Sequence, residues 1–276
     1  MSHDHEIYQV DSFIDPVRPF SGNPAGVCLL NHFPTAAWMQ SMAAEMNLSE
    51  TAFVCPGPGH LVPGHFQLRW FTPTTEVDLC GHATLAAAHA LWASGRLAIE
   101  TAALFQTLSG ELQACIKDDL IELDFPAEPV KITEPPELLL SCLSHVPTAV
   151  SRNRMDYLVE LADEEQVQDV KINLPQLKQL PVRGLIVTAR SERRGLDFVS
   201  RFFAPAVGVD EDPVTGSAHC GLAPYWGERL QKQTMSAYQA SPRGGAITVR
   251  LAGPRVILAG AAQTVFCGKL QVQPDQ

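Results

Sequence analysis

The sequence predicts a mixed α/β protein of two pseudo-symmetric lobes, each a mostly antiparallel sheet wrapped around a central apolar helix. Three observations predict it: a motif that recurs about half a chain apart, an apolar helical stretch after each copy, and short alternating strands around them. The 276 residues, 46% of them hydrophobic, can bury the core of one large domain or two modest ones. We expect an N-terminal lobe over 1–127 and a C-terminal lobe over 128–276, whose last strand can pack back on the first.

The repeat is the main evidence for two lobes. The segment Arg69-Trp-Phe-Thr-Pro-Thr-Thr-Glu-Val-Asp78 recurs as Arg201-Phe-Phe-Ala-Pro-Ala-Val-Gly-Val-Asp210, with Arg, Phe, Pro, Val and Asp at the same spacing. A turn of small residues follows each copy and opens an apolar helix. We place the three extra residues of the second copy in Glu211-Asp-Pro-Val214. Because the offset is close to half the chain, duplication explains the match.

Periodicity predicts the elements of the first lobe and the central helix of the second. Alternation and β-branched or aromatic content predict strands over 6–13, 26–30, 50–55, 65–72, 101–107 and 120–125. A helix over 35–47 has apolar residues at helical spacing. The helix from 82 to about 94 is too apolar for a surface and should be sheathed by strands, and its partner runs from about 217 to 230.

Charge and composition limit the partners. Acidic residues outnumber basic ones, 30 against 20, and Lys and Arg form no cluster, so we expect no nucleic acid and no membrane surface as partner. The first eight residues show no signal-peptide pattern, and the most apolar stretch, 83–93, is too short to span a bilayer. Seven scattered cysteines fit reduced thiols, so we expect a cytoplasmic protein.

Both central helices begin at a glycine, where the first backbone N–H groups and the positive end of the helix dipole can hold an anion. If the lobes pack about a pseudo-twofold axis, both starts face one cleft that suits a small carboxylate substrate. The substrate-binding residues that we expect there are Asn23, Gly81, Ala83, Gly216, Ala218 and Gly244.

Polar side chains gather near these turns, and each has a structural alternative. Glu50 stands between a helix and an apolar strand, where it could also be a helix-end partner. His82 could be a hydrogen-bonded core histidine, and Asp212 a turn former before Pro213. Ser217 and His219 complete the set.

At these residues the chain resembles the PhzF family of phenazine biosynthesis-like isomerases, which share the diaminopimelate epimerase fold. Four motifs, in family order, carry the resemblance over nearly the whole chain: Ser21-Gly-Asn-Pro-Ala-Gly-Val27, Asn47-Leu-Ser-Glu-Thr-Ala-Phe53, Asp78-Leu-Cys-Gly-His-Ala-Thr84 and Glu211-Asp-Pro-Val-Thr-Gly-Ser-Ala218.

The resemblance implies a biosynthetic isomerase without cofactor or metal, which we expect to be a homodimer. In the characterised branch, a glutamate removes a proton from one ring carbon of a dihydro-hydroxyanthranilate and returns it to another. The family's catalytic positions fall on Glu50, His82, Asp212 and Ser217. A carboxylate enclosed by apolar walls has a raised pKa and can act as base and then as acid.

Three other interpretations stay open at this stage. An amino- or hydroxy-acid racemase or epimerase would use Cys80, although the second copy offers no matching cysteine. A family member could also bind a small ligand or partner without catalysis. A metal site from Cys80, His82, His219 and Cys220 is disfavoured, because adjacent side chains on a helix point about 100° apart.

Overall fold

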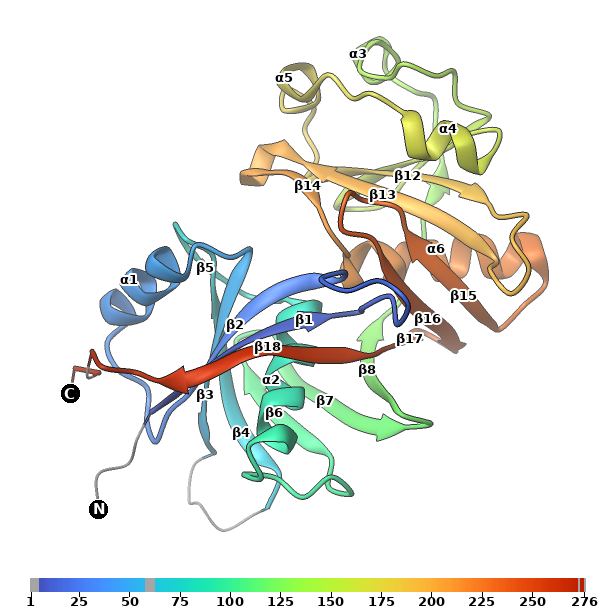
Figure 1. The fold of residues 1–276 in the computed structure, drawn as a ribbon. Helices are drawn as coiled ribbons and strands as arrows, with labels where there is room; N and C mark the ends of the chain where they lie inside the picture. The colour runs from blue at the N-terminus through green and yellow to red at the C-terminus, as the bar shows by residue number, and fades with distance from the viewer. Residues whose placement is uncertain (1–4, 58–62, 273, 276) are drawn as a thin grey trace. The chain divides into compact units, whose positions relative to one another are not determined.

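The computed structural model describes residues 5–57, 63–272 and 274–275. The chain forms two compact units, Met1–Asp124 with Ala259–Gln276, and Phe125–Leu258 (Figure 1). It therefore leaves the first unit once and returns to it for its last strand. The division at residue 127 into independent domains stays a prediction. Residues 1–4, on which part of the signal-peptide expectation rests, lie outside the described ranges.

The sheet of the first unit is mostly antiparallel. The strand β1 (Glu6–Ser12) pairs antiparallel with both β2 (Asn23–Leu29) and the last strand, β18 (Ala262–Lys269). The strand β2 pairs parallel with β3 (Glu50–Pro56), and β3 pairs antiparallel with β4 (His65–Phe71). The strand β4 in turn pairs parallel with β6 (Ala103–Thr107). The short β5 (Glu76–Val77) flanks β4, and β7 (Gly110–Lys117) and β8 (Leu120–Pro126) continue antiparallel from β6.

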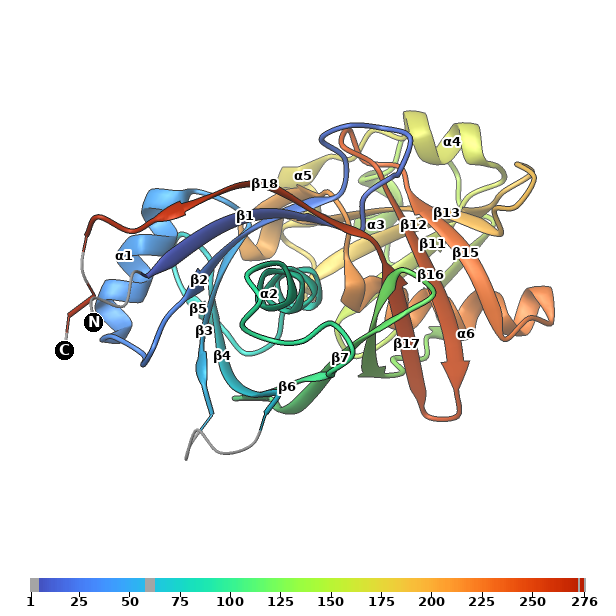
Figure 2. The ribbon, with the colours of Figure 1, turned by 60° about the horizontal axis from the view of Figure 1, so that its bottom comes forward.

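This sheet curves around one buried helix, α2 (Gly81–Ala93), which Figure 2 shows end-on. Side chains on all sides of α2 are buried, as its all-round apolar sequence requires. The helix α1 (Ala36–Met46), capped by Thr35, packs Met39 and Ala43 against Phe53 and Phe71 of the sheet. No helix of the described residues is both long enough and apolar enough to cross a bilayer.

The second unit repeats the pairing scheme. The strand β11 (Asp156–Glu160) pairs parallel with β12 (Gly184–Arg190), and β12 pairs antiparallel with β13 (Phe198–Ala204). The strand β13 pairs parallel with β15 (Thr234–Gln239), which pairs antiparallel with β16 (Gly245–Ala252). Its long helix is α6 (Gly216–Leu230), which contacts β15 and β16. This is the order found from β2 to β7 in the first unit, so the fold class predicted from the sequence is confirmed.

The remaining elements of the second unit complete its edges and outer layer. Strands β9 (Lys131–Ile132) and β10 (Ala149–Arg152) extend the sheet beyond β11, and β14 (Val209–Asp212) flanks β13. The strand β17 is Arg255–Gly260, and a 3₁₀ turn spans Pro205–Val207. Short helices α3 (Glu137–Ser141), α4 (Glu164–Asp169) and α5 (Leu174–Leu177) pack a second apolar cluster against β12 and β13.

The pairing registers put the two repeated segments at equivalent positions. Phe53 of β3 lies opposite Arg69 of β4, and Val187 of β12 lies opposite Arg201 of β13. Each arginine therefore occupies the same rung of its own sheet, as the repeat predicts.

Ion pairs after the repeated arginines correct one detail of the sequence alignment. Arg69 pairs with Glu76 and Arg201 with Glu211, each with a shortest N···O distance of 2.7 Å. The sequence separation is seven residues in the first pair and ten in the second. The three extra residues therefore lie before Glu211, around the 3₁₀ turn, and their placement within 211–214 is wrong.

Candidate active site

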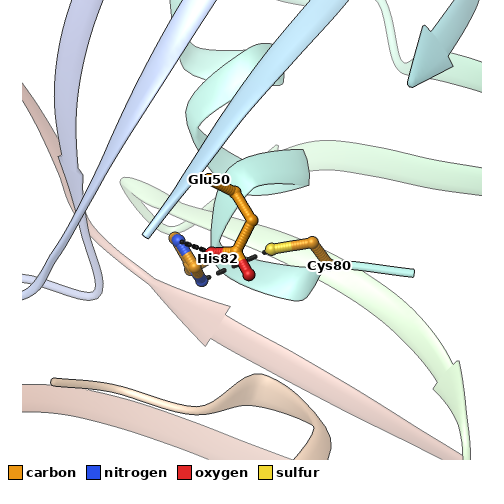
Figure 3. Close-up of side chains that lie close together, drawn as sticks. All are labelled: Glu50, Cys80 and His82. Carbon is orange, nitrogen blue, oxygen red and sulfur yellow. Dashed lines mark hydrogen bonds and ion pairs between the residues drawn. The ribbon is translucent and has the colours of Figure 1, made fainter. Parts of the chain in front are cut away.

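Glu50 and His82 meet at one end of α2 (Figure 3). The Glu50 Oε2 atom lies 3.2 Å from His82 Nε2, without the alignment of a hydrogen bond. The side chains are 17% and 6% exposed, respectively. A carboxylate and an imidazole that contact each other with so little water can exchange or hold a proton.

The fold explains this meeting of residues far apart in sequence. Glu50 is the first residue of β3, beside Ala25 of β2, and His82 is the second residue of α2. Ser12 of β1 donates a 2.8 Å hydrogen bond to the His82 carbonyl oxygen, which ties the first turn of α2 to the sheet.

Asn23 contacts the other side of the imidazole. Its side chain is fully buried, with Nδ2 3.2 Å from His82 Nδ1, and Ser49 Oγ lies 3.4 Å from its Oδ1 atom. An amide offers a donor on one side and an acceptor on the other, so it can serve His82 in either protonation state. These contacts assign Asn23 a place behind the imidazole, and its predicted contact with substrate stays a prediction.

The charges in this cluster are coupled. Burial acts to lower the pKa of His82, but Cys80 and Glu50 outweigh it and raise that pKa well above 6.5. Burial raises the pKa of the Cys80 thiol, and Glu50 raises it further, against His82. Cys80 and Glu50 therefore both favour the proton on His82, against the effect of burial.

Glu50, Cys80 and His82 are also a possible metal-ligand set, since one donor atom from each lies within 4.8 Å of the others. The imidazole stands between the other two: Nε2 faces Glu50, whereas Nδ1 lies 3.5 Å from Cys80 Sγ. One ring nitrogen cannot face both partners, so this arrangement suits proton transfer better than metal binding.

The start of α6 in the second unit is built by different residues. The Thr215 hydroxyl donates to the Asp212 carboxylate, and its backbone N–H donates to Gln239 Oε1 at 2.9 Å. Gln239, fully buried, donates back to the Asp212 carbonyl oxygen at 2.7 Å. Asp212 and Gln239 together fix the turn that opens α6.

Ser217, the second residue of α6, contacts an arginine that the sequence analysis missed. Arg183 Nη1 donates to Ser217 Oγ at 2.8 Å, and Arg183 also holds the buried Asp156 through Nε, at 2.9 Å, and Nη2. No motif marks Arg183 or Asp156. The only signal in the sequence is an arginine just before an apolar strand.

Comparison with known proteins identifies the family. The family model of phenazine biosynthesis-like proteins (PhzC-PhzF) matches residues 10–268. An uncharacterized isomerase of Halalkalibacterium halodurans is 49% identical over 265 residues, which cover 96% of this chain and 97% of that protein. The crystal structure of a PhzF-family protein from Enterococcus faecalis matches with a TM-score of 0.90 at 40% identity, covering 98% of this chain and 100% of the other. This chain belongs to the PhzF family.

Membership in the PhzF family supports an isomerase in general. A structure from Pseudomonas aeruginosa described as a predicted epimerase has a TM-score of 0.76 at 21% identity, covering 98% of this chain and 100% of that one. That likeness concerns the fold alone.

The two helix starts of this PhzF-family chain correspond residue by residue. Cys80 and Thr215 are the respective N-caps, so His82 corresponds to Ser217. The side chain three positions after each opening glycine bonds back to the N-cap carbonyl: Thr84 to Cys80 O at 2.6 Å, and His219 Nδ1 to Thr215 O at 2.7 Å. His219 thus has a structural role at the start of α6.

The other expected substrate-binding residues lie at or near the two helix starts. Gly81 is partly exposed, whereas the residues Ala83, Gly216 and Ala218 are buried within the first turns. Gly244 has a φ of +68°, and its N–H donates to Ser241 Oγ at 3.0 Å. Their contact with a substrate stays a prediction.

Proposed function

We propose that this protein is a PhzF-type isomerase that moves a proton between two carbons of a small carboxylic acid, with Glu50 as base and then acid. The observation that carries the proposal is the enclosed Glu50–His82 contact at 3.2 Å. Chemistry of this kind needs one group that can take and return a proton next to a group that stabilises its charge.

The proton balance of the proposed reaction is simple. The Glu50 carboxylate removes a proton from a carbon next to a double bond, and the electron pair left behind spreads over the unsaturated acid. Glu50, now a carboxylic acid, returns the proton to a different carbon. Nothing is oxidised or reduced, and Glu50 ends as it began, while His82 stabilises its ionised form.

Exchange of substrate protons with D₂O tests the proposal. Small unsaturated and hydroxy acids are screened by NMR with the wild-type protein, and the acids that exchange are repeated with Glu50→Gln. Glutamine keeps the shape but cannot act as an acid or a base near neutral pH, so we expect a loss of roughly 10²–10⁴-fold. Full exchange by a folded Glu50→Gln variant would overturn the proposal.

Two further variants serve as controls. Glu45→Gln removes an exposed carboxylate of α1, five residues from Glu50, and should leave the exchange rate unchanged. Glu50→Asp should recover little activity, because its shorter side chain draws the carboxylate away from the substrate.

Cys80 distinguishes the proposed isomerase from the racemase alternative. A two-base racemase needs a second acid or base, and the residue that corresponds to Cys80 in the second unit is Thr215. We therefore expect Cys80→Ala to keep its proton exchange. Loss of α-proton exchange in folded Cys80→Ala, with Glu50→Gln still active, would favour the racemase.

Several finer points stay predictions. That Asp212 and Ser217 take part in the reaction stays a prediction, which the variants Asp212→Asn and Ser217→Ala test in the same exchange measurement. The expected homodimer can be measured by analytical ultracentrifugation.

A further inference from the structure

The duplicated units differ at one rung of their sheets. Phe53 and Val187 are the residues that pair with the repeated arginines. Glu50 of β3 and Gly184 of β12 each lie three residues before them and therefore correspond. In the first unit the rung joins Ala25 and Glu50, and in the second it joins Asp156 and Gly184. Each unit thus has one carboxylate on this rung, but on different strands.

The second unit has no room for a copy of Glu50. A Cβ atom on Gly184 would lie 2.6 Å from Phe202 Cζ and 2.7 Å from the Phe203 carbonyl oxygen. Backbone atoms cannot yield as a flexible side chain can. An acid or base at this position is therefore excluded by the sheet itself.

The carboxylate of the second unit is not available as a base. Asp156 is 1% exposed, and two nitrogens of the Arg183 guanidinium hold it. Arg183 corresponds to Ser49, one residue before the Glu50 position, and lies over the Phe202 ring at 5.0 Å. An arginine thus stands one residue before the position at which the first unit has its acid–base group.

Arg183 keeps donors for a ligand. A guanidinium has five N–H donors. Two bind Asp156 and one binds Ser217, which leaves one on each Nη atom without a partner among the described residues. Because Ser217 Oγ accepts from Arg183, the serine hydroxyl hydrogen is directed elsewhere. The Arg183 side chain is 28% exposed, so solvent reaches it.

We propose that Arg183 and Ser217 are a carboxylate-binding pair of the second unit. This inference goes beyond the proposed function of Glu50. Two N–H donors and one O–H donor suit the two oxygens of a carboxylate. Asp156 offsets the charge of Arg183, so the pair suits a singly charged acid better than a doubly charged phosphate. In this account the second unit has an acid-binding pair next to the rung at which the first unit has Glu50.

Binding of simple acids tests the proposal without turnover. Benzoate and crotonate are titrated into the ¹⁵N-labelled full chain, with benzamide, crotonamide and inorganic phosphate as comparison probes, and the Ser217 amide signal is followed. We expect saturable binding of at least one acid, no shift with its amide, and weaker binding of phosphate.

Variants then assign the binding to the pair. Arg183→Gln alone would leave the buried Asp156 charge unpaired and can fail to fold. The double variant Asp156→Asn with Arg183→Gln keeps a neutral pair there. We expect this double variant and Ser217→Ala each to bind the acid about 10- to 100-fold more weakly, because a hydrogen bond to a charged group is lost. Arg190→Gln, at the exposed far end of β12, should bind normally.

The outcomes separate this proposal from the role of Glu50. Glu50→Gln should bind the acids normally, whether or not it exchanges protons. If Glu50→Gln still exchanges protons but the double variant no longer binds the acid, the proposed mechanism is wrong and the acid site is supported. The acid site would be overturned by unchanged affinity in the folded double variant, by equal binding of the amide or of phosphate, or by no saturable acid binding to the wild type.

Discussion

Two buried histidines, one in each copy of the repeat, respond in opposite ways to their surroundings. His82 lies against the Glu50 carboxylate, and its pKa is raised well above 6.5. His219 donates to the Thr215 carbonyl oxygen and stacks on Phe198 at 6.1 Å, and burial lowers its pKa to about 4. The first is placed to be charged and the second to be neutral.

We expect His82 of the wild type to titrate above pH 6.5 because Cys80 and Glu50 together outweigh the effect of burial. Cys80→Ala and Glu50→Gln should therefore each lower the pKa of His82. The titration is followed by the imidazole carbon-bound proton signal in NMR. An unchanged pKa of His82 in both variants would contradict this assignment.

His219 should make the protein less stable in acid. Its pKa is about 4 in the folded protein and near 6.5 when unfolded, so the unfolded state binds the proton more tightly. Above pH 6.5 the imidazole is neutral in both states. As the pH falls from 6.5 to 4, the unfolded state takes up a proton while folded His219 stays neutral, so the free energy of unfolding falls by about 3 kcal/mol.

Urea unfolding at several pH values measures this loss. His219→Thr copies Thr84, which makes the corresponding bond at the start of α2. It should flatten the dependence between pH 6.5 and 4, although the cavity beside Phe198 makes it less stable at every pH. An unchanged slope would mean that other groups set the acid stability.

At the scale of single residues, motifs locate the catalytic candidates but not their support. Glu50 and His82 can be named from the sequence because each lies in a recognisable segment, and the structure brings them together. Arg183 and Asp156 cannot, because only strand pairing brings them beside Ser217. An arginine before an apolar run has many explanations when the pairing register is unknown.

The repeated arginines join strands at equivalent places but with unequal surroundings. Arg69 binds Glu76 through two hydrogen bonds of 2.7 Å, and both side chains are 26% exposed. Arg201 is 12% exposed and binds Glu211 in the same way. It also donates to the carbonyl oxygens at the end of α4, those of residues Val167, Gln168 and Val170.

Replacing each arginine by methionine should reveal this inequality. Arg201→Met leaves Glu211 and three carbonyl oxygens without their donor, and should destabilise the second unit by about 3 kcal/mol or more. Arg69→Met should destabilise the first unit by about 1 kcal/mol. The indole N–H signals of Trp226 and Trp70 report the two units separately during urea unfolding. Equal effects would show that the α4 contacts contribute little.

Helices are easier to predict from the sequence than the pairing of strands. The sequence predicts the three long helices to within one or two residues, because Thr35, Gly81 and Gly216 mark their starts. Short strands such as β5 and β14 carry too few residues for a period to appear. The extra residues of the second copy were misplaced because Val77-Asp78 matches Val209-Asp210 by chance, whereas the ion pairs define the true alignment.

The first unit is made from both ends of the chain, and β18 is the part that closes it. This strand pairs with β1 along its whole length. Thr264 of β18 also lies 3.0 Å, Oγ1 to Nε2, from His89 of α2. Most residues of β18 are exposed, but the strand contacts α2, and this contact adds to the hydrogen bonds with β1.

Removing residues 261–276 should therefore abolish cooperative unfolding of the first unit. The truncated chain would expose α2 and the edge of β1, and we expect it to aggregate or to lose the dispersed signals of Trp70 and Trp92. Removing only residues 272–276 keeps β18 and loses little beyond the bonds from Thr35 to Asp275, so it should remain folded. A soluble, cooperatively unfolding chain without β18 would contradict the prediction.

Gly184 also bears on how the two halves of the gene diverged. Because Phe202 and the main chain at Phe203 fill the space of a Cβ atom, no single codon change at 184 can restore a glutamate there without moving the backbone. An acid–base group is thus difficult to introduce into the second half, since the backbone at Phe203 would have to move. Related sequences should therefore keep glycine at the position of Gly184, and the ancestor of both halves is best sought among proteins whose sheets leave that space open.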